Sequence, residues 1–261
     1  MSKIAWTDKT VNPGIYGCGH AGPGCFNCYA EKMAARLVRM GAHPDHGQVH
    51  MDGAEKGRWT GKVTVDYDHI APAFAVLPKQ KPKRVFVTSM ADLWHRDVPY
   101  DFLDRVFAEE AARPHISFQN LTKRSGRLAA YAQDRARRGL AWPANAWVGV
   151  TTADQPRFNA RVRHLREVPA RVRFLSIEPQ VGPVDVGGLE GIGWVIVGCE
   201  SLRGRAGRPL ELDWVRLVRD RCVAAGVPFF LKQLIVDGRV QQLPTLDGEV
   251  WAQFPRGARD V

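Results

Sequence analysis

Short apolar runs alternate with amphipathic segments along most of the chain, and this alternation predicts the fold. Each run is brief, rich in β-branched and aromatic residues and bounded by turn residues, which is typical of a buried strand. The runs cover residues 84–88, 116–120, 146–150, 172–177, 194–198 and 227–231, and a weaker run near residues 3–6 adds a first strand.

Helical patterns with one apolar face lie between these runs. Asp101 and Asp213 are each expected to cap a helix, while Phe158, Val162 and Leu165 recur at i, i+4 and i+7. Buried strands that alternate with one-sided helices predict parallel βαβ units. Six or seven units fit a partial TIM-type (β/α) barrel better than a complete eightfold one, so we expect an α/β fold of that kind.

Length and charge narrow the possibilities. The 261 residues, 45% of them hydrophobic, predict one large domain over residues 1–261 with an insertion around residues 41–80. No apolar stretch approaches the roughly 20 residues of a membrane span, so no association with a membrane is expected. The net charge of +10 favours a polyanionic partner such as a nucleic acid, and a basic surface without a partner is the alternative.

Three cysteines near the start of the chain suggest a metal centre. Cys18, Cys25 and Cys28 are spaced C-x6-C-x2-C on a Gly- and Pro-rich run, so their thiolates can converge, and no fourth cysteine lies nearby. Cys199 and Cys222 are expected to be small buried hydrophobes. The N-terminal residues show no apolar signal-peptide core, which predicts a cytoplasmic protein with reduced or metal-bound thiols.

The cysteine run alone leaves the nature of the centre open. His20 could complete a Cys3His site for zinc, which would make the chain a zinc-stabilised nucleic-acid-binding protein without catalysis. An iron–sulfur cluster fits the local spacing equally well. Thiols without any metal are the third interpretation.

Polar residues follow the predicted strands at their carboxyl ends. Because these ends meet at one edge of a parallel sheet, the side chains are expected to surround one pocket. The cysteine run, followed by a helical pattern over residues 29–37, is then the first βα loop and opens onto the same pocket. The polar residues are Ser89, Asp92 and His95, then Lys123 and Arg124, Thr151 and Thr152, Glu178, Glu200 and Ser201, and Lys232 and Gln233.

These blocks, taken in order, resemble the phage-associated three-Cys-motif family, a radical-SAM-like group found in phages and bacteria. The resemblance covers nearly the whole chain, although radical SAM proteins commonly space their cysteines C-x3-C-x2-C. The matching blocks are Trp6-Thr7-Asp8, Asn12-Pro13, Gly17-Cys18, Pro23-Gly24-Cys25-x-Asn27-Cys28-Tyr29-Ala30, Ser89-Met90-x-Asp92-Leu93-x-His95, Leu121-Thr122-Lys123-Arg124, Glu178-Pro179, Gly198-x-Glu200-Ser201 and Phe229-Phe230-x-Lys232-Gln233.

The resemblance implies a radical-SAM-like partial barrel and a radical S-adenosylmethionine enzyme. Cys18, Cys25 and Cys28 would ligate three irons of a [4Fe-4S] cluster, and S-adenosylmethionine would bind the fourth. An external electron donor would then allow formation of a 5′-deoxyadenosyl radical, and a partner protein that completes the activity is the further partner considered. The remaining site residues implied are Ser89, Asp92, Thr151 and Glu178 for the cofactor, and Lys123, Glu178, Glu200 and Lys232 for catalysis.

The substrate is expected to be a nucleic acid or nucleotide, because arginines recur beside the predicted pocket. Arg157 and Arg161 are expected on a helix face away from the cysteine run. Trp94, Trp142 and Trp147 could stack on bases, with core packing as the alternative. The further basic residues are His164, Arg124, Arg127, Arg135, Arg137 and Arg138, and, after Glu200, Arg203, Arg205 and Arg208.

Overall fold

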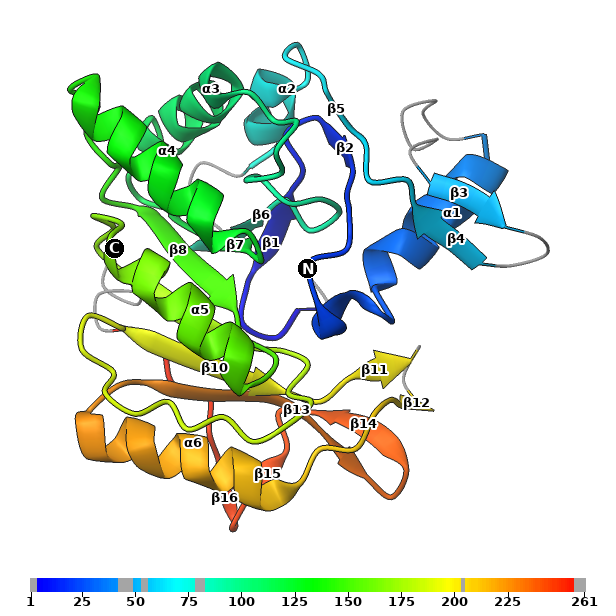
Figure 1. Ribbon diagram of the computed structural model, residues 1–261, viewed down its shortest axis with the longest axis vertical. Helices are drawn as coiled ribbons and strands as arrows, with labels where there is room; N and C mark the ends of the chain where they lie inside the picture. The colour runs from blue at the N-terminus through cyan, green and yellow to red at the C-terminus, as the bar shows by residue number, and fades with distance from the viewer. Residues whose placement is uncertain (1–3, 42–48, 53–55, 78–82, 203–204, 256–261) are drawn as a thin grey trace.

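The structure, a computed structural model, describes residues 4–41, 49–52, 56–77, 83–202 and 205–255. Its main element is a ten-stranded sheet in the order β1-β6-β7-β8-β9-β10-β13-β14-β12-β11, which curls into a mostly parallel half-barrel (Figure 1). The parallel strands are β1 (Lys9–Val11), β6 (Arg84–Val87), β7 (Ser117–Thr122), β8 (Ala146–Thr151), β9 (Arg173–Ile177), β10 (Trp194–Gly198) and β13 (Phe229–Val236).

Antiparallel strands extend one edge of the sheet and form three small sheets elsewhere. β14 (Arg239–Gln242), β12 (Arg205–Ala206) and β11 (Ser201–Leu202) continue the main sheet beyond β13. The small sheets pair β2 (Ile15–Gly17) with β5 (Val63–Val65), β3 (Val49–Asp52) with β4 (Lys56–Trp59), and β15 (Thr245–Leu246) with β16 (Glu249–Val250).

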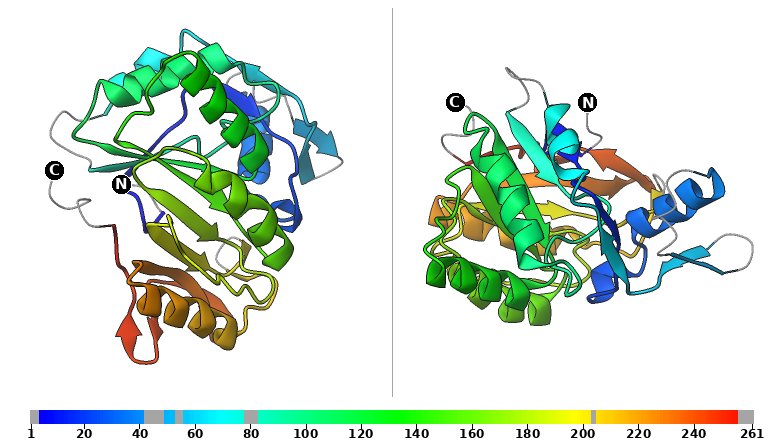
Figure 2. Two further views of the ribbon diagram at one scale, coloured as in Figure 1. Left: turned by 60° about the vertical axis from the view of Figure 1, so that its left-hand side comes forward. Right: turned by 90° about the horizontal axis from the view of Figure 1, so that it is seen from above.

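Helices cover the outer face of the half-barrel. Figures 1 and 2 show α3, α4, α5 and α6 following one another along this face. Helix α1 instead lies beside the β3–β4 hairpin, apart from the outer layer. The helices are α1 (Tyr29–Arg39), α2 (Ile70–Ala75), α3 (Tyr100–Ala111), α4 (Ser125–Arg137), α5 (Gln155–Arg166) and α6 (Leu212–Ala225), with a short 3-10 helix η1 (Pro23–Cys25).

The predicted partial α/β barrel is confirmed as a curled half-barrel, and two local predictions are wrong. The first strand is Lys9–Val11 and not residues 3–6, whose apolar Trp6 packs into the core instead. Asp101 and Asp213 do not cap helices: each is the second residue of its helix, after Pro99 and Glu211 respectively. Acidic residues are favourable anywhere in the first turn of a helix, so an aspartate two positions after the cap gives a similar sequence signal.

Two apolar layers follow from the alternation of side chains along the parallel strands. Val148, Leu175 and Val195 face the helices and join the large core. The residues between them point to the concave face, where aromatic rings pack into what we call the aromatic floor. The floor comprises Trp6, Phe86, Trp147, Val172, Phe174, Trp194, Ile196 and Phe230. It closes the amino end of the half-barrel and leaves the carboxyl edge for polar groups.

In the described part of the chain, no helix is both long and apolar enough to cross a membrane. The region predicted as an insertion, residues 41–80, lies partly outside the described residues, which here include the β3–β4 hairpin, β5 and α2.

Candidate functional site

The cysteine loop, residues 18–28, crosses the carboxyl ends of the parallel strands. In Figure 1 the arrowheads of β8 and β10 point toward the dark-blue segment between β2 and α1. Gly17 and Gly22 have positive φ angles of 94° and 127°, which glycine adopts without strain. Pro23 then opens η1 and Cys28 directly precedes α1, so the loop is folded by its own turn residues.

Three arginines hold this loop by alternate backbone carbonyls. Arg124 Nη2 donates to Gly19 O at 2.8 Å. Arg161 Nη2 donates to Ala21 O at 2.5 Å, and Arg208 Nη2 donates to Pro23 O at 2.9 Å. Because the three side chains come from different βα units, the loop is tied to the strand ends at three separate points.

An acid orients Arg124. The Asp92 carboxylate accepts hydrogen bonds from Arg124 Nη1 at 2.8 Å, Thr122 Oγ1 at 2.6 Å, and the backbone N–H groups of Trp94 and Lys123 at 3.0 and 3.1 Å. Four donors occupy its two oxygens, and the residue is only 6% exposed. Asp92 therefore has little capacity left for a cofactor amine.

A second acid orients Arg208. Glu200 accepts from Arg208 through both carboxylate oxygens, with Nη2 to Oε1 at 2.5 Å and Nε to Oε2 at 3.0 Å. Burial opposes ionisation of Glu200, but the hydrogen bonds from Arg208 outweigh it and lower the pKa of this carboxyl. The bidentate pair fixes the guanidinium that reaches Pro23.

Among the described residues, Arg161 forms no ion pair with an acid, and it binds two carbonyls. Besides Ala21 O, its guanidinium donates to Thr151 O at 2.6 Å, at the carboxyl end of β8. Burial lowers the pKa of Arg161. The prediction that Arg157 and Arg161 lie away from the cysteine loop is wrong, since a Cβ on Gly22 would lie 3.6 Å from a nitrogen of each. A periodic pattern on one helix could not indicate what packs against that face.

The thiols are free and differ in exposure. Cys25 is buried, whereas Cys18 and Cys28 are half-buried. Cys25 Sγ accepts from Ala21 N at 3.4 Å, and Cys18 Sγ lies 3.9 Å from Arg124 Nη1. Burial, with the negative charge of Asp92, raises the pKa of Cys18 to about 12, against the opposing effect of Arg124. N–H donors directed at sulfur are typical of thiolates that ligate metal.

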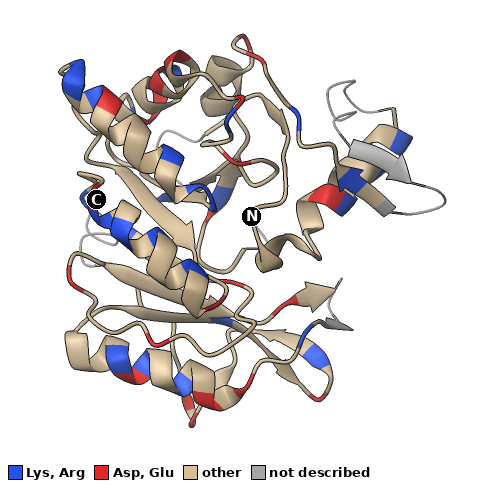
Figure 3. Ribbon diagram, in the orientation of Figure 1, with Lys and Arg blue, Asp and Glu red and all other residues tan. Residues whose placement is uncertain are grey.

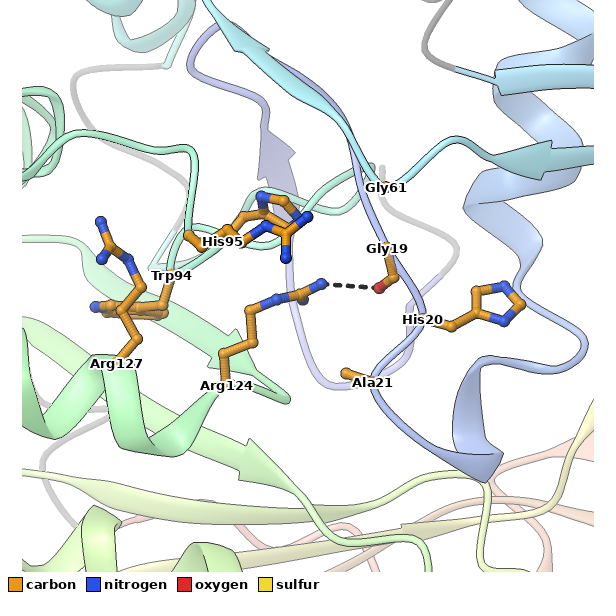
Figure 4. Close-up of a pocket in the computed structure, with 9 residues that line it drawn as sticks. Gly19, His20, Ala21, Gly61, Trp94, His95, Arg124 and Arg127 are labelled. Carbon is orange, nitrogen blue, oxygen red and sulfur yellow. Dashed lines mark hydrogen bonds between the residues drawn. The ribbon is translucent and has the colours of Figure 1, made fainter.

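The fourth zinc ligand suggested by the sequence is used otherwise. His20 Nε2 lies 3.0 Å from Glu31 Oε1, and in Figure 4 its ring turns toward α1. Within the described ranges, no group of three His, Cys, Asp or Glu side chains is arranged to hold a single metal ion. In a cluster, by contrast, each thiolate takes a separate iron. The donor set of three free thiols on one loop therefore fits a cluster in its chemistry.

Glu178 and Lys232 form an ion pair among the strand ends. Lys232 Nζ lies 2.6 Å from Glu178 Oε2, and Ser176 Oγ donates to Glu178 Oε1 at 3.2 Å. Both side chains are largely buried, with 20% of Lys232 and 11% of Glu178 exposed. The structure thus brings together two of the predicted catalytic residues, although they are 54 positions apart in the sequence.

The other predicted site residues border the loop. Ser89 Oγ donates to Asn12 Oδ1 at 3.2 Å, and Tyr29 Oη donates to Ser89 O. A Cβ on Gly24 would lie 3.6 Å from Lys123 Cε. Thr151 contributes its carbonyl to Arg161, as described above. Loop and strand ends are therefore in direct contact around the site.

Several arginines expected at the pocket rim are committed to structural partners. Arg135 and Arg138 both bind Asp104 on α3, at 2.7 and 2.6 Å. Arg157 pairs at 3.1 Å with Asp154, the residue that caps the start of its helix. Figure 3 shows these basic segments of α4 and α5 on the outer helical layer. Arg203 lies outside the described residues, and of Arg205 only the backbone is described, in β12.

His164 and the tryptophans have packing roles. His164 Nδ1 lies 3.0 Å from Ser125 Oγ. Trp94 and Trp147 are buried, and Trp142 packs on Phe107 with a centroid distance of 4.8 Å. The core alternative is therefore confirmed for the tryptophans. Cys199 and Cys222 are also buried, at 3% and 0% exposure, as expected.

A cavity of about 390 Å³ opens beside the first residues of the cysteine loop. Figure 4 shows His95, Arg124 and Arg127 around it, with Arg124 reaching across to Gly19. Burial lowers the pKa of His95, and the charge of Arg124 acts in the same direction. The lining residues are Gly19, His20, Ala21, Gly61, Trp94, His95, Arg96, Arg124 and Arg127.

Fold and site together define the class of this protein: a mixed α/β protein whose half-barrel carries a cysteine-bearing loop across its carboxyl edge. The chain belongs to the family described as "Protein of unknown function (DUF5131)", whose model matches residues 1–255. Comparison with curated proteins and with solved structures found no match. Radical SAM chemistry and an association with phages stay predictions.

Proposed function

We propose that this protein is a radical S-adenosylmethionine-type enzyme that modifies or repairs a nucleic acid or nucleotide. The observation that supports this most is the cysteine loop, which Arg124, Arg161 and Arg208 hold across the carboxyl ends of the strands. Barrels of this kind carry their chemistry at that edge. The substrate class rests on the net charge of +10.

Cys18, Cys25 and Cys28 would hold three irons of an open-site [4Fe-4S] cluster. Together with S-adenosylmethionine, the bound cluster would supply one-electron cleavage of the sulfonium and a 5′-deoxyadenosyl radical that removes hydrogen from the substrate. The protein's own contribution at the sulfurs is positive charge and hydrogen bonding. Ala21 N donates to Cys25 Sγ and Arg124 Nη1 lies 3.9 Å from Cys18 Sγ, an arrangement typical of sulfur ligands whose charge a bound metal centre would stabilise.

The roles of two predicted residues change in this proposal. Asp92 and Glu200 act through Arg124 and Arg208, so we assign them as positioning residues of the loop. Ser89, Thr151 and Glu178 remain the candidates that face the cofactor. Lys123 and the Glu178–Lys232 pair remain the candidates for moving a proton, since a lysine beside a carboxylate can exchange one with a substrate heteroatom.

The aromatic floor and the loop would exclude water from this site. Trp194, at the centre of the floor, is fully buried and contacts Trp6 and Phe230 at centroid distances of 6.3 and 6.0 Å. Such a dry wall protects reactive species from quenching.

Anaerobic reconstitution with iron and sulfide tests the proposal. We expect a brown protein with about four irons per chain, as the formula of the cluster requires, and 5′-deoxyadenosine on reduction with S-adenosylmethionine. Cys18→Ala, Cys25→Ala and Cys28→Ala should each lose the iron. Cys199→Ala and Cys222→Ala are the controls and should retain it, because both thiols are buried and neither lies on the cysteine loop; Cys222 is the stricter control, since Cys199 lies within reach of the charge of Lys232.

Two results would overturn the proposal. One is a colourless protein with stoichiometric zinc, which would favour the non-catalytic nucleic-acid-binding alternative despite the engagement of His20 by Glu31. The other is equal loss of iron from the control variants, which would mean that iron binds without regard to the cysteine loop.

A further inference from the structure

We infer that the cavity beside the cysteine loop, which we call the phosphate pocket, binds a phosphate group of the substrate. Nucleotides and nucleic acids both carry phosphate, so a phosphate is the part of the proposed substrate that this pocket would recognise. The assignment to a substrate rests on the proposed function. The binding itself depends only on residues that the structure describes. The pocket is the cavity of about 390 Å³ bordered by Arg96, Arg124 and Arg127.

Guanidinium groups form much of the wall of the phosphate pocket. Arg96, whose side chain is 81% exposed, and Arg127 line it together with Arg124. Arg127 Nη2 donates to Val98 O at 2.6 Å, and its guanidinium lies 4.6 Å from the centre of the Tyr100 ring. These contacts orient the guanidinium at the pocket wall, where its positive charge favours an anion.

His95 adds an N–H donor to this wall. Its Nδ1 accepts from Asp97 N at 3.3 Å, which leaves the proton of the neutral ring on Nε2. A Cβ on Gly19 would lie 3.6 Å from that Nε2 and 3.6 Å from Arg124 Nη2. Gly19 thus places no side chain between the imidazole and the guanidinium, and all three residues line the pocket.

One carboxylate lies beside the cations of the phosphate pocket: Asp97, whose side chain is 38% exposed, is 3.5 Å from His95 Nδ1 and 3.6 Å from Arg96 Nε. Two backbone acceptors at the pocket are occupied. Gly19 O and Ala21 O accept from Arg124 and Arg161. The carboxylate of Asp92 has four donors, as described above. Donors and positive charge therefore dominate the wall, and an anion with several oxygens is complementary to it.

Charge also decides between substrate and cofactor. The sulfonium and amino groups of S-adenosylmethionine are cationic and would meet Arg96, Arg124 and Arg127, so we assign the phosphate pocket to the substrate. Its volume falls within the roughly 300–1,000 Å³ typical of small-molecule sites, which is enough for one nucleotide.

Calorimetric titration of the full-length protein tests the inference. Adenosine 5′-monophosphate should bind, and adenosine at the same concentration should not. Arg127→Gln should weaken binding about tenfold or more, because it removes a charge-assisted donor. Arg163→Gln, an equal loss of charge at an exposed position of α5, should leave the affinity unchanged.

His95→Phe provides a second variant, which keeps an aromatic ring but lacks the ring N–H and should also weaken binding. A dinucleoside monophosphate distinguishes a phosphate within a strand from that of a free nucleotide, and binding of either probe supports the pocket. Affinity for both probes that is absent, or unaltered in both the Arg127 and His95 variants, would overturn the inference. Displacement of the nucleotide by S-adenosylmethionine would overturn it too.

Failure of this inference can be told apart from failure of the proposed function. Cys28→Ala should lose iron and still bind adenosine 5′-monophosphate, because Cys28 does not line the pocket. A wild-type protein that binds the nucleotide without assembling a cluster would refute the proposed function alone. A protein that assembles the cluster and cleaves S-adenosylmethionine but binds neither probe would refute the phosphate pocket alone.

Discussion

Arg161→Met should release the centre of the cysteine loop and leave the helix that carries it intact. Methionine retains most of the apolar stem of the side chain but loses both carbonyl contacts, to Thr151 O at 2.6 Å and Ala21 O at 2.5 Å. Hydrogen bonds from a charged donor contribute about 1.5–3 kcal/mol each, and the cost of burying the guanidinium offsets part of this. We expect a loss of roughly 2–4 kcal/mol in the free energy of unfolding.

Arg157→Met is the matched control for this change. Arg157 lies on the same helix and beside the same Gly22, but its ion pair is with Asp154 three residues earlier, and its side chain is 40% exposed. Pairs of this kind contribute less than about 1 kcal/mol. A comparison of the two variants therefore distinguishes the effect of losing the carbonyl contacts from the effect of changing any arginine beside the loop.

Two measurements test this prediction. Urea unfolding followed by circular dichroism gives the free energy of unfolding, and hydrogen exchange of the peptide spanning residues 18–28 reports how firmly the loop is held. Exchange in this peptide should rise tenfold or more in Arg161→Met, which corresponds to about 1.4 kcal/mol or more, and should be unaltered in Arg157→Met. Equal protection of the loop in both variants would show that Arg161 does not hold it, and the reasoning on the three arginines would then fail.

Two further predictions concern the core. Burial raises the pKa of Glu110 to about 8, and the unpartnered Asn120 Oδ1 suits a protonated carboxyl that can donate. In this pH range the folded state retains a proton that the unfolded state releases. The free energy of unfolding of the wild type, relative to that of Glu110→Gln, should therefore fall by roughly 1.4 kcal/mol per pH unit as pH rises from 4.5 to about 8. Urea titrations of both proteins at several pH values measure this difference. An unchanging difference between the two proteins would contradict this. Gly149→Ala should lower stability by about 1–3 kcal/mol or more, since its Cβ would lie 2.4 Å from the ring of Phe174 on the neighbouring strand. A melting temperature equal to that of wild type would refute the close approach.

The sequence predicted the parallel strands well because they are buried on both faces. Runs such as 194–198 and 146–150 contain only apolar residues and glycine, a pattern typical of strands that are covered on both faces of a parallel sheet. The first strand escaped prediction because Lys9–Val11 has one buried side chain in three residues, and the apolar residues before it serve the aromatic floor. Local pattern thus identified strands only where burial was continuous.

The candidate site was predicted less completely, because its contacts join distant parts of the chain. Cysteine spacing and polar strand ends indicated where the chemistry should lie. The partners were not visible: Arg161 and Ala21 are 140 residues apart, and Arg124 and Asp92 are 32 apart. The sequence pattern is the same for a strand-end carboxylate that binds a ligand and for one that orients an arginine. The hydrogen bonds of Asp92 to Arg124 and of Glu200 to Arg208 therefore became visible only in the structure.

The aromatic floor has a consequence for how a substrate can approach. Trp194 and its neighbours fill the amino end of the half-barrel, so the site is a blind-ended cup and not a passage. If the substrate is the nucleic acid that we propose, a strand would not thread through the amino end and would offer an end or a single unit turned out of its stack. Length of the polymer would then matter little for turnover, while the ease of exposing that one unit would govern which positions along it react.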